Sequence, residues 1–237
     1  MAATARSRVW QRIGYAAAAS LLVVLALFAF LVGPLLLAPN EYAGTPSIEH
    51  SRIFRDPAMM KLAWEMPVAS RYRRAFEFQH NQSVCGPTSI ADVLRSVGRP
   101  LTQEQVLTGS PKRPWFGYLL GGLTLDQVGD LLARRSGQRV VVLRNLNLDR
   151  FRGRMVLLND PRHRVIANFH RGPLFGRGHG HFSPLLAYLP RQDLVLVGDV
   201  NPSFRPFLVD TARLWKAVNT TDPETRRSRG LVDLTLS

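Results

Sequence analysis

The sequence predicts an α+β domain, with helices packed on an antiparallel sheet, behind one transmembrane or signal helix. Three features of the chain lead to this prediction. Residues 13–38 form one long apolar segment, helix signals dominate from there to Gly137, and short apolar runs between turn residues dominate afterwards. Helices followed by a run of strands are typical of an α+β domain, whereas regular alternation would indicate a doubly wound α/β sheet.

The apolar segment, residues 13–38, contains no charged residue, and about 20 apolar residues suffice to cross a bilayer. Three arginines lie before it, in the basic N-terminal segment 1–12, and no Lys or Arg follows until Arg52. The positive-inside rule therefore predicts a cytoplasmic N-terminus and, in a bacterial inner membrane, a single-pass protein with its domain in the periplasm. A signal sequence that is cleaved to release the domain into the periplasm is the alternative.

The segment after the anchor divides into a polar linker, residues 39–51, and one domain of ordinary size, residues 52–237. The formal net charge of +14 suits an anionic membrane surface or small anionic ligands. An exported domain rarely meets nucleic acid, and no nucleic-acid motif occurs in the sequence, so no such partner is expected. The single cysteine cannot form an internal disulfide. No sequence feature indicates an oligomer.

Two helices are predicted in the first part of the domain. Asp56 and Pro57 have the pattern of an N-cap followed by a first helical residue, and the helix is expected to run to about Met66. Apolar residues with helical spacing over 90–97 predict a second helix, which follows Cys85 and is ended by Gly98.

Two capping boxes predict two further helices. Thr102 with Gln105, and Thr124 with Gln127, have the three-residue spacing that lets each side chain bond the other residue's backbone N–H. Gly137 is expected to end the second of these helices, because glycine readily adopts the left-handed conformation that closes a helix.

The C-terminal half is expected to consist mainly of strands. A short helix is predicted at 211–218. Short apolar runs joined by turn-rich links predict strands at residues 140–143, 155–158, 165–169, 183–189, 194–197 and 230–236.

The one cysteine, Cys85, is a candidate nucleophile because it stands directly at the start of a predicted helix. The helix dipole and the free N–H groups at that end stabilise an anion, which lowers the pKa of a thiol placed there. Gly86 is expected to leave space for a substrate backbone. The alternative is that Cys85 is a small buried apolar residue without chemical function.

A thiol nucleophile needs a base, and the base needs a partner that orients it. His181 heads one predicted strand and Asp199 ends the next, so an antiparallel pairing of these strands would bring the two side chains together. Gln79 lies shortly before Cys85 and could donate its amide to an oxyanion. A zinc site on His179 and His181, completed by the cysteine or the aspartate, is the alternative.

Taken together, these residues resemble the phytochelatin synthase family, of the bacterial single-domain type, within the papain-like cysteine peptidase superfamily. The resemblance covers about residues 50–235. The matching segments are Gln79 with Cys85-Gly86, the helix sequence SIADVL, the Gly-His-Phe-Ser-Pro segment 180–184, Asp199-Val200, and residues 214–232 with a Trp-containing helix and a basic segment.

The resemblance implies a papain-like fold and a catalytic triad of Cys85, His181 and Asp199, with Gln79 in the oxyanion hole. It also implies glutathione γ-glutamylcysteinyltransferase or glutathione hydrolase activity. Cys85 would cleave the Cys–Gly amide of glutathione, release glycine and form a thioester that passes to water or to a second glutathione. No cofactor is required, and any dependence on Cd or Zn would act through a metal–glutathione thiolate substrate.

The sequence also departs from the family pattern. After Asp199 the family carries a basic and aromatic run of the type ARYKYPP, whereas this chain has NPSFRPF. Pro202 stands at the first basic position and Arg205 falls elsewhere, so hydrolysis is expected rather than chain-building synthesis. The candidates for substrate contacts are Gly86, Gly180, Ser183 and Arg205.

Two other functions remain as alternatives. A papain-like peptidase of the bacteriocin-leader type, acting on another peptide, also has a Gln before Cys-Gly and a later His and Asp. A non-catalytic, membrane-tethered thiol- or metal-binding module would need Cys85 and the histidines, but neither Asp199 nor Gln79.

Overall fold

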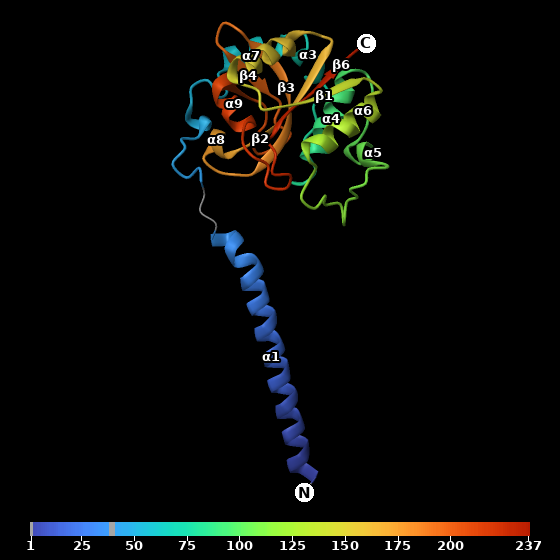
Figure 1. Cartoon of the computed structure of the whole chain (residues 1–237), viewed down its shortest axis with the longest axis vertical. Helices are drawn as coiled ribbons and strands as arrows, with labels where there is room; N and C mark the ends of the chain where they lie inside the picture. The colour runs from blue at the N-terminus through green and yellow to red at the C-terminus, as the bar shows by residue number, and fades with distance from the viewer. Residues whose placement is uncertain (1, 38–40) are drawn as a thin grey trace. The chain divides into compact units, whose positions relative to one another are not determined.

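The structure, a computed structural model, describes residues 2–37 and 41–237 (Figure 1). It divides into two units, Met1–Glu41 and Tyr42–Ser237. The first unit is helix α1 (Ala2–Leu37), and its stretch Gly14–Leu31 is long and apolar enough to cross a membrane. A signal sequence near the N-terminus has the same properties, so both predictions for this segment stand.

The second unit begins inside the segment predicted to be a linker. The ring centroid of Tyr42 lies 5.0 Å from that of His170, and Ile48 is buried in a 3-10 turn, Ile48–His50. Residues 42–51 therefore pack on the domain and are not a free linker. Residues 38–40 lie outside the described part of the chain.

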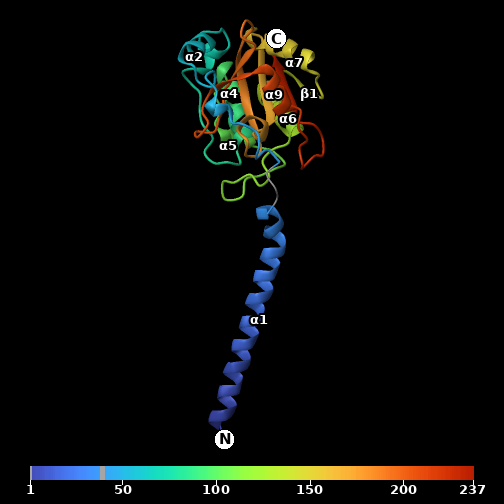
Figure 2. The ribbon, with the colours of Figure 1, turned by 90° about the vertical axis from the view of Figure 1, so that its left-hand side faces the viewer.

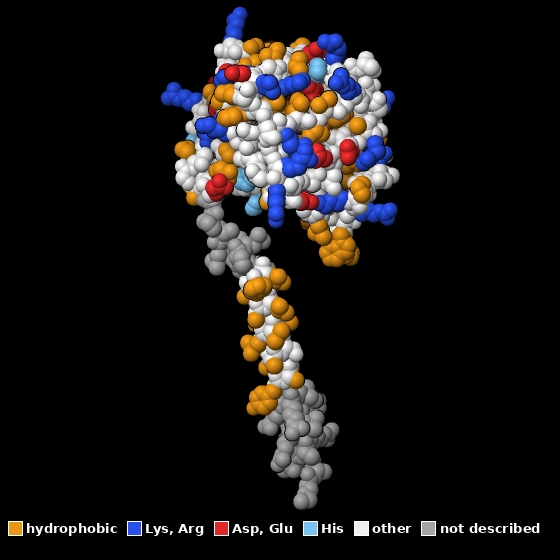
Figure 3. All heavy atoms as spheres, in the orientation of Figure 1, with side chains coloured by type: hydrophobic (Ala, Val, Ile, Leu, Met, Phe, Trp, Pro, Cys, Tyr) orange, Lys and Arg blue, Asp and Glu red, His pale blue; other side chains and the backbone are white. Residues whose placement is uncertain are grey.

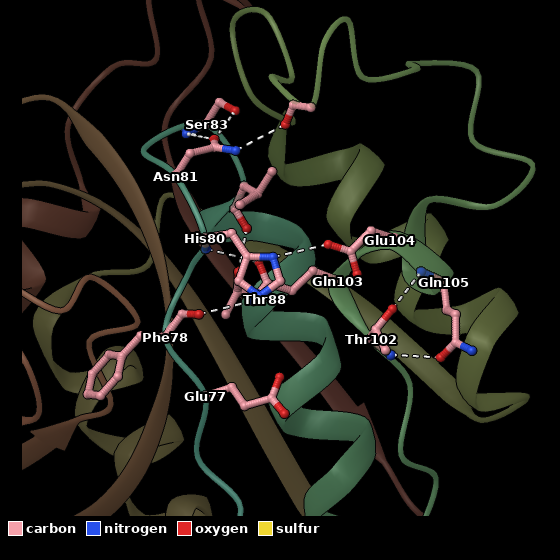
Figure 4. A network of polar contacts seen from close by, with 12 residues as sticks. Glu77, Phe78, His80, Asn81, Ser83, Thr88, Thr102, Gln103, Glu104 and Gln105 are labelled. Carbon is pink, nitrogen blue, oxygen red and sulfur yellow. Dashed lines mark hydrogen bonds and ion pairs between the residues drawn. The ribbon is translucent and has the colours of Figure 1, made fainter.

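Three helices begin where the sequence predicts them, at Pro57, Gln103 and Leu125, whereas the short helix at 69–72 is not predicted. Asp56 accepts a hydrogen bond from the N–H of Met59, which caps α2, and both predicted capping boxes are formed, that of α5 being drawn in Figure 4. Gly137 ends α6 with a left-handed backbone, φ 64°. The helices of this part are α2 (Pro57–Trp64), α3 (Ala69–Tyr72), α4 (Cys85–Ser96), α5 (Gln103–Leu107) and α6 (Leu125–Ser136).

The strands form one antiparallel sheet with the order β1-β6-β2-β3-β4-β5. The C-terminal strand is thus inserted between β1 and β2. The helix predicted at 211–218 is present as α9 (Thr211–Val218). The strands are β1 (Arg139–Arg144), β2 (His163–His170), β3 (Gly180–Leu189), β4 (Leu194–Val197), β5 (Phe207–Asp210) and β6 (Gly230–Thr235).

One predicted strand is wrong. Residues 155–158 close helix α7 (Leu148–Val156) and continue into the 3-10 turn Leu157–Asn159. The helix begins before the apolar run, because Asn147 caps it through the N–H of Arg150. The buried residues Phe151, Met155 and Leu158 then fall at i, i+4 and i+7, which is one helical face.

The sheet separates two apolar cores, with α4, α5 and α6 on one side and α7, α8 (Gly172–Phe175) and α9 on the other (Figures 1 and 2). Alternate residues of β2 enter the two cores: Ile166 packs into the first, and Val165, Ala167 and Phe169 pack into the second. Both faces are covered, which explains why the strands read as continuous apolar runs instead of alternating ones. On the face drawn in Figure 3, Lys and Arg are scattered and do not form a single stripe.

Asp92 connects helix α4 to the segment that precedes the cysteine. Its Oδ1 accepts hydrogen bonds from the N–H of Glu77 and from Nη1 of Arg95, both at 3.0 Å. Its buried Oδ2 has no hydrogen-bond partner among the described residues. Burial raises the pKa of Asp92 to about 8, although the N–H of Glu77 and the charge of Arg95 act in the opposite direction.

We expect this raised pKa to make the domain less stable as the pH rises. The unfolded chain loses the Asp92 proton near pH 4, whereas the folded protein loses it near pH 8, so alkali favours unfolding. Between pH 6 and pH 9 this loss amounts to about 3 kcal/mol. Asp92→Asn keeps the hydrogen-bond acceptor and should remove that loss, as measured by urea unfolding at both pH values.

Glu77→Gln is the matched control, because Glu77 is a partly exposed carboxylate beside the same arginine. It should retain the pH dependence of the wild-type protein. If the free energy of unfolding falls equally between pH 6 and pH 9 in wild type and in Asp92→Asn, Asp92 is ionised throughout this pH range.

Candidate active site

Cys85 is buried and is the first residue of helix α4, whereas the sequence predicts that the helix follows it. The preceding residue, Val84, has no side-chain acceptor with which to cap the helix. The N–H groups of the first turn lack helical partners, and Pro87 in this turn has no N–H to satisfy. This end of α4 therefore favours an anion at the cysteine.

Gly86 has a packing role that differs from the predicted one. A Cβ at this position would lie 3.3 Å from Cδ1 of Leu123 and 3.3 Å from Cγ2 of Val128. The space is therefore occupied by Leu123, which precedes α6, and by Val128 within α6, and it is not left open for a substrate. Glycine allows α4 to approach these residues closely.

His181 and Asp199 lie next to one another, as the sequence predicts. Strands β3 and β4 are antiparallel neighbours, and Nε2 of His181 lies 3.0 Å from Oδ1 of Asp199. The same oxygen accepts the backbone N–H of Asn201 at 2.8 Å. Because an ionised carboxylate only accepts hydrogen bonds, Nε2 is the protonated nitrogen and Nδ1 remains to take a proton from the thiol.

Arg171 is a member of this site that no pattern in the sequence indicates. Its Nη2 donates to Oδ1 of Asp199 at 2.9 Å, and its Nη1 lies 2.8 Å from Oδ2. The guanidinium also lies 3.7 Å from the ring centroid of Phe204, so it is held between a carboxylate and an aromatic face. Asp199 is thus fixed from two sides, by the imidazole and by the guanidinium.

The charges in the site shift its pKa values against the effect of burial. Burial would raise the pKa of Asp199, but the charges of His181 and Arg171 hold it at about 2. Burial lowers the pKa of His181, but the charge of Asp199 raises it above its ordinary value. Burial raises the pKa of Cys85, but the charge and hydrogen bond of His181, with a backbone hydrogen bond from Phe182, lower it overall. The site therefore favours a thiolate beside an imidazolium.

Gln79 is buried and attached to the loop that carries the aspartate. Its backbone N–H donates to the carbonyl of Val200 at 2.8 Å, one residue after Asp199. In the described structure, its side-chain Oε1 has no hydrogen-bond partner. The segment around it is held to α5 by His80 and Gln103, as Figure 4 shows. Its place in an oxyanion hole remains a prediction.

A cavity of about 670 Å³ opens beside Cys85. Three parts of the chain build it: the residues before α4, the segment that leads into α6, and the sheet with the turn before β6. The lining residues are Gln82, Ser83, Cys85, Tyr118, Leu119, Gly121, Gly122, Leu123, Asn168, His179, Gly180, Phe182, Asp222, Pro223, Glu224 and Arg229.

Arg229 is the buried cation of this cavity, and no pattern in the sequence assigns it a role in the site. Its Nη1 donates to Oδ1 of Asn168 at 3.1 Å and lies 3.3 Å from Oδ2 of Asp222. Its buried Nε has no partner within the described residues. A guanidinium with a carboxylate beside it suits a ligand that carries both a carboxylate and an ammonium group.

The other predicted substrate contacts divide into two groups. Gly180 lines the cavity. Ser183 is fully buried in β3, and Arg205 is exposed with a left-handed backbone, so both lie outside the lining. For the zinc alternative, the described chain contains no group of three or more His, Cys, Asp or Glu side chains placed to hold a metal ion.

Comparison with sequences of known proteins identifies several plant relatives. Glutathione gamma-glutamylcysteinyltransferase 3 of Lotus japonicus is 36% identical over 114 residues, covering 46% of this chain and 23% of its own length. Glutathione gamma-glutamylcysteinyltransferase 1 of Triticum aestivum is 28% identical over 179 residues, which cover 66% of this chain and 34% of the relative. Glutathione gamma-glutamylcysteinyltransferase 2 of Arabidopsis thaliana is 30% identical over 179 residues, which cover 66% of this chain and 37% of the relative. The chain thus spans about a quarter to a third of the length of these relatives.

Comparison with solved structures supports the fold. A C39-like peptidase from Bacillus anthracis has a TM-score of 0.50 and 12% sequence identity, over 70% of this chain and 96% of that chain. At this identity the similarity concerns the fold alone, and it agrees with the predicted papain-like α+β architecture. The phytochelatin synthase family model matches residues 49–231, a range that includes Cys85, His181 and Asp199. That match covers most of the chain and shows that it belongs to the phytochelatin synthase family.

Proposed function

We propose that this protein is a thiol acyl-transferase or hydrolase that acts on glutathione. The observation that carries the proposal is the buried pair of His181 and Asp199, which promotes a thiolate at Cys85 beside a cavity with its own buried arginine. The family match and the names of the relatives support glutathione as the substrate.

In the first half of the reaction, Nδ1 of His181 takes the proton of the Cys85 thiol. The thiolate attacks the carbonyl carbon of the Cys–Gly amide, and a C–S bond forms. The backbone N–H of Cys85 and the amide of Gln79 donate to the oxyanion. The C–N bond then breaks, His181 returns its proton to the amine of the leaving glycine, and the γ-glutamylcysteinyl thioester remains.

In the second half, His181 removes a proton from the acceptor, which attacks the thioester carbonyl. With water as the acceptor the product is γ-glutamylcysteine, and with the amine of a second glutathione it is a longer peptide. In both cases the C–S bond breaks and Cys85 regains its proton. Hydrolysis is the favoured outcome. Arg205, the one basic residue between Asp199 and the start of β5, is exposed and outside the cavity lining, so it adds no cation for a second anionic substrate.

The cavity supplies groups that match the γ-glutamyl end of glutathione. That end carries one carboxylate and one ammonium group. Arg229 would bind the carboxylate, and the nearby carboxylate of Asp222 would bind the ammonium group. Cadmium or zinc would enter as a thiolate complex of glutathione, as part of the substrate.

We expect Gly180→Ala to weaken substrate binding more than catalysis. An added Cβ at this position would lie 2.7 Å from Cζ of Arg229, so the guanidinium has to move from its place beside Asn168. The KM for glutathione should rise about tenfold or more, whereas kcat changes less, as measured by glycine release. Gly153→Ala is the matched control, because a Cβ there meets no atom within 4 Å.

The function is tested by mass spectrometry of glutathione after incubation with the detergent-solubilised full chain. Glycine with γ-glutamylcysteine, or with longer γ-glutamylcysteine peptides, is expected from wild type and not from Cys85→Ser. Glutathione that stays intact with and without added zinc or cadmium would contradict the proposal. That outcome would favour a papain-like peptidase with another peptide substrate, or a binding module.

The proposed location is a bacterial inner membrane, with α1 as a single span, the N-terminus in the cytoplasm and the catalytic domain in the periplasm. The apolar stretch Gly14–Leu31 and the arginines before it support this orientation. The intact mass of the protein recovered from membranes tests it. Loss of the N-terminal segment, with the protein in the soluble periplasmic fraction, would show a cleaved signal instead.

A further inference from the structure

The loop between α5 and α6 exposes a cluster of large apolar side chains. Figure 3 shows an apolar protrusion at the lower edge of the domain, where this loop lies in Figure 1. The exposed fractions are 65% for Trp115, 85% for Phe116, 56% for Tyr118 and 66% for Leu120. A cluster of this kind at a surface marks a site of interaction with a protein or a membrane.

The backbone holds this tip in one conformation. Trp115 and Tyr118 exchange two backbone hydrogen bonds, at 2.8 and 2.9 Å, around Phe116 and Gly117, which both have positive φ. Nδ2 of Asn81, in the segment before α4, donates to the carbonyl of Gly117 at 3.0 Å. These hydrogen bonds reduce the backbone freedom that the tip has to lose on binding.

The loop lies at the end of the domain where the chain enters. In both ribbon views, the green loop and the light-blue first residues of the second unit lie at the same lower end of that unit (Figures 1 and 2). Residues 38–41 connect Tyr42 to Leu37 at the end of α1, and the five extended Cα–Cα steps between them span at most ~18 Å. If α1 crosses a bilayer, Tyr42 at this end of the domain lies within that distance of the end of the anchor.

We propose that residues 112–120 form a second membrane contact, in which the aromatic tip inserts into the interface of a bilayer that contains anionic phospholipid. This inference rests on the proposed membrane anchor. Trp and Tyr favour the headgroup level of a bilayer, and exposed Phe and Leu gain by burial among the acyl chains. Arg113, beside the tip, is exposed and has no side-chain ion pair among the described residues, so it can meet the lipid phosphates.

The same segment forms one wall of the cavity, through Tyr118 and Leu119. Docking of the tip would therefore set the orientation of the cavity mouth relative to the membrane. Trp115, Phe116 and Leu120 are not among the lining residues, so their replacement should leave glycine release from glutathione unchanged. This separates the membrane contact from the chemistry.

The test places the full chain in vesicles of phosphatidylcholine and phosphatidylglycerol with brominated acyl chains, which quench nearby tryptophan. The fluorescence of Trp115 is obtained as the difference between wild type and Trp115→Phe. More than half of this component is expected to be quenched, and the double variant Phe116→Ser/Leu120→Ser should lose that quenching. Val156→Ser, at an exposed apolar residue of α7, should keep it.

Three outcomes overturn the inference, and they are distinguishable. If the protein does not float with vesicles in a density gradient, the anchor itself fails. If it floats but Trp115 is quenched by aqueous iodide and not by bromine, the loop stays in water and the anchor stands. If Phe116→Ser/Leu120→Ser also loses glycine release in detergent, the tip belongs to the catalytic site instead.

Discussion

Replacement of Cys85 by serine is expected to lower the rate of glycine release from glutathione by at least about a thousandfold. Serine has nearly the same shape, so the helix start and the cavity should remain intact. A hydroxyl keeps its proton at a pH where the thiol of Cys85 has lost it, and His181 cannot stabilise an alkoxide as it stabilises the thiolate. The measurement is kcat/KM for glutathione, with circular dichroism to check the fold.

The rate at which iodoacetamide alkylates the protein is an independent measure of the ionisation of Cys85, because Cys85 is the one thiol of the chain. The thiolate is the reactive form, and its pKa is lowered in the folded protein. Alkylation of the folded protein should therefore continue at pH values where it has already slowed in the urea-unfolded chain. Equal pH profiles for the two states, or a Cys85→Ser activity within tenfold of wild type, would show that the site does not activate this residue.

Asp199→Asn is expected to reduce turnover by about a hundredfold to ten-thousandfold. The amide is neutral, so it no longer raises the pKa of His181, and the imidazolium gives up its proton at a lower pH. The thiolate then loses its main positive neighbour, and the pH midpoint of Cys85 alkylation should move upward. A binding module without catalysis would keep its affinity for thiols and metals in this variant.

The same substitution leaves Arg171 buried without a carboxylate, which should cost about 3 kcal/mol of unfolding free energy. The double variant Asp199→Asn/Arg171→Met removes the unpaired charge and should recover part of that stability, while turnover stays low. Recovery of turnover in the double variant would mean that Asp199 acts only by neutralising Arg171. Full stability of the single variant would contradict a buried ion pair at this position.

The two helices that begin with a capping box were predicted correctly. Thr102 and Thr124 cap helices through bonds to residues three positions away, so the signal is local and complete in the sequence. The run at 155–158 was assigned to a strand because its helical face begins outside the run, at Phe151. Strand β5 was not predicted because it follows Pro206 directly, which reads as a turn residue.

The residues of the site also divide into those with a local signal in the sequence and those without one. Cys85, His181 and Asp199 were identified because each stands at the end of a predicted helix or strand, where few residue types carry chemistry. Arg171 and Arg229 carry no comparable signal, since the chain has 31 Lys and Arg residues in total. Their importance comes from partners distant in sequence, 28 residues for the pair with Asp199 and 61 for the bond from Arg229 to Asn168. Gly86 was misread because its neighbours, Leu123 and Val128, reach it only through the tertiary fold.

The most direct test of acyl transfer through Cys85 is intact-protein mass spectrometry of the full chain, quenched with acid shortly after mixing with glutathione. The expected result is a γ-glutamylcysteinyl adduct, located on Cys85 by peptide mapping, together with an initial burst of about one glycine per protein. The adduct should be absent from Cys85→Ser and should accumulate less in Asp199→Asn. Glycine released at the wild-type rate with no adduct on Cys85 at any time, or from Cys85→Ser as well, would contradict a thioester mechanism at this residue.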